Sequence, residues 1–145
     1  MAEKLTSDSL GYLLVQTCKA HRGLAEKLWS EIGLHVGQDM ILRRLWQADG
    51  IMQSELADHL CIQAATVTKT LQRMEQTKLI ERRGDPEDQR VSRVYLTDQG
   101  RAMLQPYEEV WAKLEQYTTQ GLSLEERVLF RRLLMQVLDN LTKQI

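Results

Sequence analysis

Polar and cationic side chains are concentrated in one segment near the middle of the chain, residues 63–76. If Val67, Leu71 and Met74 point into a core, the other positions of a helix here face outward. Those outward positions include Thr66, Thr68, Lys69, Gln72 and Arg73. Threonine methyl groups contact thymine, glutamine reads adenine, and arginine or lysine reads guanine or holds phosphate. The pattern alone fits both a DNA-reading helix and an ordinary solvated helix face.

A second group of charged residues surrounds the turn-forming run 84–89, Gly-Asp-Pro-Glu-Asp-Gln. Arg90 follows this turn, and a guanidinium suits the negative potential of a narrow minor groove. We expect Asp88 to hold Arg90 by a charge-assisted hydrogen bond. We expect Arg82 and Arg83 to contact phosphate, whereas Arg93 fits a phosphate contact and a surface strand charge equally well.

The elements that must position these residues form a compact middle unit. Two short amphipathic helices are predicted over 54–60 and 64–76, and only residues 61–63 join them, which is typical of a helix-turn-helix. Leu56, Ala57 and Leu60 face inward on the first of these helices. Period-two patterning over 80–83 and 91–96 then predicts a β-hairpin with a polar, charged tip.

Longer helices are predicted on both sides of this unit. Apolar residues at helical spacing predict a helix over 9–32, stopped by Gly33, and a shorter one over 36–48. The inward residues of the shorter helix are Met40, Ile41, Leu45 and Trp46. Thr97 caps a helix that continues to about residue 120, in which Pro106 predicts a kink or break.

The terminal helices carry broad apolar stripes that the rest of the chain offers little to cover. A capping box at 123–126 opens the last helix. Its stripe consists of Phe130, Leu133, Leu134, Val137, Leu138, Leu141 and Ile145. The middle unit, of about 60 residues, is near the lower limit for independent stability. Pairing with a second copy would bury the stripes, as would an intramolecular helical bundle.

Composition limits the remaining classes of protein. The 145 residues are 43% hydrophobic, enough for one compact unit or two small lobes, and no apolar run is long enough to span a membrane. The net charge is −1, but residues 63–101 carry eight Lys/Arg against six Asp/Glu. Cys18 and Cys61 form neither a disulfide framework nor a zinc motif, so we expect a cytoplasmic protein with no metal or cofactor. We expect both thiols to be buried and inert; the alternative is that either one is an oxidant sensor, since a thiolate beside cationic residues is reactive.

Five segments together resemble the multiple antibiotic resistance regulator (MarR) family. They read SELADHL at 54–60, TVT at 66–68, LIER at 79–82, DPEDQR at 85–90 and LTDQG at 96–100. The resemblance implies a mostly α-helical winged helix-turn-helix protein with a small β-hairpin. It further implies dimerisation helices at 1–34 and 104–145, and a DNA-binding domain at 35–103. The function implied is that of a homodimeric transcriptional regulator, in many members a repressor, which binds a palindromic operator until a ligand or oxidant releases it.

Four positions depart from the family pattern. Met52 stands where Thr or Ser usually caps the first motif helix, so that either Ser54 caps it later or the cap is weaker. Cys61 replaces a small turn residue. Lys78 replaces a glycine that often ends the reading helix, so we expect a left-handed backbone at a non-glycine residue. Gly11 occupies the place of the reactive cysteine of the hydroperoxide-sensing branch, which argues against that mechanism.

The resemblance also implies a small aromatic anion as effector, bound between the dimerising helices and the DNA-binding lobe. Aromatic and cationic residues on the appropriate helices are its candidate ligands. They are Tyr12, His21, Arg22, Arg43 and Trp46, with His35 and Trp111 as further candidates. The competing class is a helical protein-interaction adaptor that uses the winged motif to bind a protein. An enzyme is disfavoured because the sequence has neither a phosphate-binding glycine loop nor a nucleophile elbow.

Overall fold

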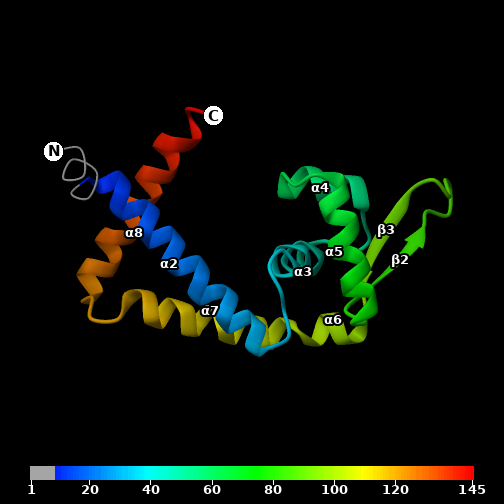
Figure 1. The fold of residues 1–145 in the computed structure, drawn as a ribbon, viewed down its shortest axis with the longest axis horizontal. Coiled ribbons are helices and arrows are strands. Elements are labelled where there is room, and N and C mark those ends of the chain that lie inside the picture. The colour runs from blue at the N-terminus through cyan, green and yellow to red at the C-terminus, as the bar shows by residue number, and fades with distance from the viewer. Residues whose placement is uncertain (1–8) are drawn as a thin grey trace. The chain divides into compact units, whose positions relative to one another are not determined.

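A computed structural model describes residues 9–145, and this part of the chain is mostly helical with a small antiparallel sheet (Figure 1). In chain order the elements are α2 (Leu10–Glu31), α3 (Gln38–Gln47), β1 (Ile51–Met52), α4 (Gln53–Leu60), α5 (Ala64–Gln76), β2 (Ile80–Gly84), β3 (Ser92–Leu96), α6 (Asp98–Ala102), α7 (Leu104–Thr119) and α8 (Leu124–Thr142). The chain divides into two compact units, 1–111 and 112–145, and each is described by itself. The fold class predicted from the sequence is confirmed.

The first two described helices begin and end where local chemistry places them. The Ser9 hydroxyl accepts a hydrogen bond from the Tyr12 backbone N–H at 3.1 Å, which caps α2. Gly33, with φ +82°, follows the helix and supplies the left-handed conformation that favours glycine. In α3, Gln38, Ile41, Leu42 and Leu45 are buried at i, i+3, i+4 and i+7, and Asp39 beside them is buried as well.

One inward residue predicted for α3 needs correction. Met40 is 44% exposed, because the helical period that buries Ile41 and Leu45 turns residue 40 outward. Leu42, which the sequence pattern did not single out, is fully buried in its place. Trp46 is half-buried and packs against the core, as predicted.

The sheet has the order β1-β3-β2, with antiparallel pairing throughout. Ile80 pairs with Leu96 and Arg82 with Val94 across the predicted hairpin, which is thereby confirmed. The third strand, β1, was not predicted; it consists of two residues, of which Ile51 pairs with Val94. Because β3 lies in the centre, the side chains of Val94 and Leu96 on its inner face are almost completely buried.

The break associated with Pro106 lies earlier than predicted. The helix that Thr97 caps ends at Ala102, and α7 starts at Leu104, so Pro106 lies in the first turn of α7. In that turn a missing N–H removes no helical hydrogen bond. The proline ring would clash instead with the carbonyl four residues earlier, that of Ala102, which explains why the interruption falls at Met103.

The core of the first unit joins α3, α4, α5 and the sheet. Its fully buried side chains include those of Leu34, Ile41, Leu42, Leu45, Leu56, Val67, Leu71, Met74 and Val94. The inward residues predicted for α4 and α5 are therefore confirmed, except that Leu60 is only half-buried. This core fixes the two helices and the hairpin against one another.

In the second unit, α8 has no buried residue. Its predicted capping box is present: the Ser123 hydroxyl accepts from the Glu126 N–H, and the Glu126 carboxylate accepts from the Ser123 N–H. The exposed large hydrophobic residues from the start of α8 to residue 145 are Leu124, Val128, Leu129, Leu133, Leu134, Met135, Val137, Leu138, Leu141 and Ile145. An apolar surface of this extent marks an interaction site.

The prediction that both cysteines are buried is wrong, because both thiols are exposed and unpaired. Cys18 lies in the half of α2 spanning residues 10–20, which contains no buried side chain. Cys61 follows the last residue of α4, at a turn that directs its side chain outward. Residues 9–145 include no helix long and apolar enough to cross a membrane. They also include no group of three His, Cys, Asp or Glu residues arranged to hold a metal ion.

Candidate nucleic-acid interface

The outer face of α5 is polar and free of packing against the core. Val67, Leu71 and Met74 are buried along the opposite face, which fixes the rotation of the helix about its axis. The exposed positions that result are Ala64, Ala65, Thr66, Lys69, Gln72, Arg73 and Gln76. The structure therefore brings four of the five predicted reading residues to one exposed surface.

The fifth predicted reading residue, Thr68, lies at the edge of this surface and is half-buried. Its hydroxyl accepts a hydrogen bond from the Gln53 side-chain amide at 2.8 Å and donates to the Ala64 carbonyl at 3.0 Å. Thr68 thus links the start of α4 to α5, the predicted reading helix, through a hydrogen bond. Sequence reasoning missed Gln53, because the predicted helix began one residue later, at position 54.

The departures from the family pattern have simple structural outcomes. Met52 is the N-cap of α4 without a side-chain cap; instead the Glu55 carboxylate accepts from the Met52 N–H at 3.3 Å. Ser54 therefore lies inside the helix, and the weaker-cap alternative is confirmed. Lys78 adopts φ +60°, as predicted, and Cys61 adopts φ +52° at the end of α4.

The tip of the hairpin is ordered by its own acidic residues. The Asp85 carboxylate accepts from the Glu87 N–H at 2.8 Å, and the Asp85 N–H donates to the Val91 carbonyl at 2.8 Å. The Asp88 carboxylate accepts from the backbone N–H of Arg90 at 3.0 Å, whereas the Arg90 Nε lies 3.7 Å from it. Asp88 therefore holds the Arg90 backbone more closely than its guanidinium.

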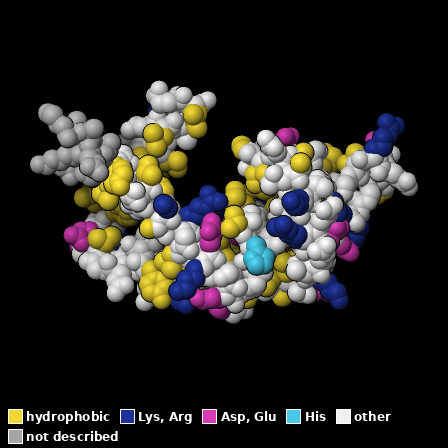
Figure 2. Space-filling view, in the orientation of Figure 1, with side chains coloured by type: hydrophobic (Ala, Val, Ile, Leu, Met, Phe, Trp, Pro, Cys, Tyr) yellow, Lys and Arg dark blue, Asp and Glu magenta, His cyan; other side chains and the backbone are white. Residues whose placement is uncertain are grey.

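Arg90 itself projects from this tip, with 94% of its side chain exposed. Figure 1 shows the hairpin extending beyond α5, and Figure 2 shows a basic side chain at its outer end. A guanidinium in this position is available to an anionic partner.

The other three arginines of the hairpin already have acidic partners. Arg82 pairs with Glu75 at 2.7 Å, and Arg83 pairs with Glu81. Arg93 pairs with Asp85 at 2.6 Å and also donates to the Gly50 carbonyl at 2.9 Å. The pKa of Asp85 is lowered below its ordinary value, and the hydrogen bond from Arg93 is the largest cause.

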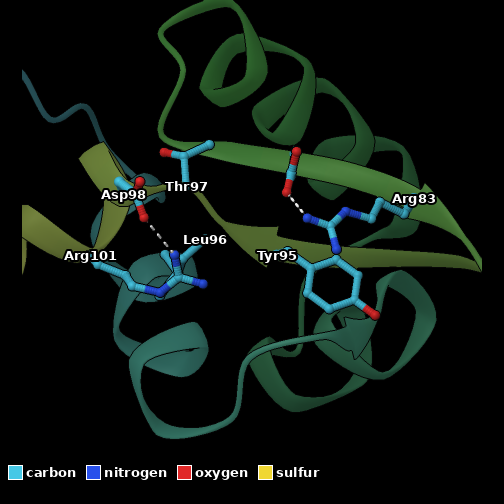
Figure 3. A pocket seen from close by; sticks show the side chains of 7 residues that line it. Arg83, Tyr95, Leu96, Thr97, Asp98 and Arg101 are labelled. Carbon is cyan, nitrogen blue, oxygen red and sulfur yellow. Dashed lines mark hydrogen bonds and ion pairs between the residues drawn. The ribbon is translucent and has the colours of Figure 1, made fainter.

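A hollow of about 390 Å³ lies on the outer face of the sheet, at the base of the hairpin (Figure 3). Arg83 stands over the Tyr95 ring, 4.5 Å from its centroid, in a cation–π contact. Arg101 bonds both Asp98 and Asp49 at 3.2 Å. The two guanidinium groups that line this hollow are thus balanced by carboxylates.

Some of the predicted effector residues lie around a cluster of aromatic rings. Trp46 lies 4.9 Å from Tyr107, and His21 lies 6.5 Å from Trp111, between ring centroids. The Trp46 indole N–H donates to the Gly100 carbonyl at 3.1 Å, so this side chain also connects α3 to α6.

Arg43 is exposed and lies close enough to Tyr107 to act on its pKa, which burial raises. Arg22 is bonded instead to Glu26 at 2.9 Å. Tyr12 precedes His21 by nine residues on α2, a distance of about 13 Å along the helix axis. The structure therefore gathers His21, Arg43 and Trp46, but not Tyr12.

Comparison with known proteins agrees with this geometry. Residues 34–92 match the MarR family. The chain is 31% identical over 133 residues to the HTH-type transcriptional regulator YdgJ of Bacillus subtilis, covering 92% of this chain and 79% of that protein. It is 30% identical to the HTH-type transcriptional repressor IacR of Pseudomonas putida, covering 80% of this chain and 70% of the repressor.

Solved structures give the same assignment. The apo form of E. coli MarR superposes with a TM-score of 0.79 at 26% identity, covering 90% of this chain and 96% of that one. A mutant E. coli MarR complexed with operator DNA superposes with a TM-score of 0.75 at 28% identity, covering 89% and 93%. This chain belongs to the MarR family and is a DNA-binding transcriptional regulator of the winged helix-turn-helix type.

Proposed function

We propose that this regulator represses transcription by binding a palindromic operator as a homodimer, and that a small effector releases it. The observation that carries the proposal is the exposed polar face of α5 beside a hairpin whose tip presents Arg90. The face offers hydrogen-bonding side chains to base edges in the major groove. The tip offers a guanidinium to the adjacent minor groove.

The site residues then have distinct roles. Thr66, Lys69, Gln72 and Arg73 read bases or hold phosphate from the exposed face of α5. Thr68 contributes its methyl group from the edge of that face, since its hydroxyl is engaged with Gln53 and Ala64.

Arg83 remains 60% exposed beside Glu81 and can reach a phosphate, whereas Asp88 holds the Arg90 backbone in place. Residues 35–103 form the DNA-binding domain in this proposal.

Dimerisation is supported by the apolar stripe of α8, which is exposed in the single chain. Phe130, Leu134, Val137, Leu138 and Leu141 lie on one side of the helix at 100° per residue. Residues 1–34, of which 1–8 lie outside the described part of the chain, and residues 104–145 would pair with the same segments of a second copy. A two-fold dimer places its reading helices about one DNA turn, ~34 Å, apart, which favours a palindromic operator.

The repressor part of the proposal draws on the similarity to IacR, which is named as a repressor. Effector binding is supported by the cluster of Trp29, Tyr107 and Trp111, with His21 and Arg43 at its edge. The buried indole N–H of Trp29 has no acceptor among residues 9–145, so the oxygen of an aromatic acid would satisfy it. A regulator of this kind acts on DNA in the cytoplasm.

A fluorescence anisotropy titration tests this function. Duplexes covering the DNA that flanks the chain's own gene are compared with a scrambled duplex, with and without salicylate-like acids. We expect one flanking duplex to bind far more tightly than the scrambled one, and an acid to weaken that binding. Equal affinity for all duplexes would refute sequence-specific regulation and favour the protein-binding adaptor.

A further inference from the structure

Arg82 points toward the reading helix, not toward solvent. Ile80 and Arg82 share one face of β2, and Arg82 is paired with Val94, which is fully buried on the corresponding face of β3. Arg83, next along the strand, faces outward, where it stands over Tyr95 (Figure 3). Strand alternation therefore gives two adjacent arginines opposite surroundings.

On the inner face Arg82 meets Glu75, which lies in the last turn of α5. The Arg82 guanidinium donates to one Glu75 carboxylate oxygen at 2.7 Å, and the Arg82 backbone N–H donates to the other oxygen at 3.2 Å. Only 24% of the Arg82 side chain and 32% of the Glu75 side chain are exposed. The Glu75 carboxylate thus accepts hydrogen bonds from both the backbone and the side chain of Arg82.

We propose that Glu75 and Arg82 are positioning residues that set the angle of the hairpin relative to the reading helix. In this assignment Arg82 acts through Glu75 and not as a phosphate contact. The assignment rests on the proposed function, in which the α5 face and the hairpin tip bind the same duplex. Glu75 therefore favours DNA binding through its bond to Arg82, although it is an acid on the DNA-reading helix.

The length of the hairpin makes this contact important. Residues 82–88 extend up to about 20 Å along the strand direction from the contact to the tip. A rotation of about 10° at the base would move the tip by about 3 Å over that length, enough to withdraw a side chain from a groove. The only covalent links between α5 and β2 are residues 77–79, and the pair adds a non-covalent bond directly across this junction.

Simple electrostatics predicts the opposite effect for Glu75. DNA is a polyanion, so removing an acid near it should strengthen binding. If Glu75 holds the hairpin, Glu75→Gln weakens binding instead, because the amide cannot form the ionic bond to Arg82. Glu81→Gln is the matched control, since it removes an acid from the outer face of the same strand and leaves the Glu75–Arg82 pair intact.

The experiment measures operator affinity of the full chain over a range of salt concentrations. We expect Glu75→Gln and Arg82→Gln each to weaken binding about tenfold, the double variant to be no weaker than either one, and Glu81→Gln to bind at least as well as wild type. Glu75→Asp keeps the charge but shortens the side chain, and it should weaken binding too. Arg82→Gln and Glu75→Gln should change the slope of log K against log salt equally, because both withdraw the same hairpin tip, whereas loss of a phosphate contact made by Arg82 itself would lower the slope by about 0.9 in Arg82→Gln alone.

A further readout separates positioning from simple destabilisation. If the hairpin is no longer delivered to the groove, Arg90→Ala should cost less in the Glu75→Gln background than in wild type. A merely less stable protein would show the full Arg90→Ala penalty in both backgrounds. Tighter or unchanged binding by Glu75→Gln, or a salt slope that falls in Arg82→Gln but not in Glu75→Gln, would overturn the assignment. Wild-type protein that binds no duplex would overturn the proposed function along with it.

Discussion

Gly100 lies against the backbone carbonyl of Leu79 so closely that a Cβ atom on Gly100 would stand 2.0 Å from the carbonyl oxygen. The Thr97 N–H donates to the same oxygen at 3.2 Å, and the Thr97 hydroxyl donates to the Lys78 carbonyl. The Gly100 carbonyl in turn accepts the Trp46 indole N–H. The LTDQG segment therefore packs and hydrogen-bonds α6 against residues 78 and 79, which connect α5 to the hairpin.

Gly100→Ala should destabilise the protein by about 1–3 kcal/mol, because the neighbour of the added methyl group is backbone and cannot rotate away. Gly23→Ala is the control: this glycine lies inside α2, and a methyl group added there would meet nothing within 4 Å beyond its chain neighbours and the backbone of its own helix. It should stabilise the helix by about 0.5–1 kcal/mol. Urea unfolding measures both, and equal effects of the two variants would contradict the role given to Gly100.

Arg90→Ala should weaken operator binding by about 1–3 kcal/mol and leave the unfolding midpoint unchanged. The physical reason is its position at the hairpin tip, with 94% of the side chain exposed and no core contact to lose. Anisotropy and thermal unfolding check the two parts. Arg22→Ala, which removes an exposed arginine from α2, should bind like wild type. Near-native affinity of Arg90→Ala at moderate salt would refute the role of the hairpin tip.

The Asp85–Arg93 pair should make stability depend on pH in the acidic range. Its hydrogen bonds lower the folded-state pKa of Asp85 below the ordinary value of 3.8. A lowered carboxyl pKa stabilises the fold above the ordinary value, and this stabilisation is lost as pH falls through the lower folded-state pKa. Asp85→Asn should therefore be less stable than wild type at pH 7, and the difference should shrink below about pH 4. Urea unfolding at several pH values measures it; a difference independent of pH would contradict this origin.

The apolar stripe of α8 should hold two chains together. Leu134→Glu combined with Leu141→Glu places two charges on that stripe and should convert the dimer to single chains of 16.8 kDa in light scattering. Gln136→Glu adds a charge on the opposite side of the helix and should leave the mass of two chains unchanged. A wild-type protein with the mass of one chain would refute the homodimer.

Much of the fold was predictable because its signals are local. Thr97 and Ser123 cap helices as predicted, and Lys78 adopts the left-handed backbone expected in place of a glycine. The two residues of β1 were missed because a strand that short has no period to detect. The helix interruption was misplaced because a proline acts on the carbonyl four residues before it.

The site was less predictable than the elements that carry it. The residue types on α5 indicated a reading face, but the sequence does not show which arginines are already bonded. Arg82 and Arg90 belong to the same hairpin, yet Arg82 forms an ion pair with Glu75, whereas the side chain of Arg90 is almost fully exposed. The difference depends on strand alternation combined with the packing of α5, and only the three-dimensional structure supplies that combination.

Hydroxyl-radical footprinting of the operator duplex tests the central claim most directly. Two protected regions about one helical turn apart are expected, flanked by minor-groove protections that disappear in Arg90→Ala. A single protected region, or uniform protection along the duplex, would contradict a two-fold reader with a hairpin in the groove.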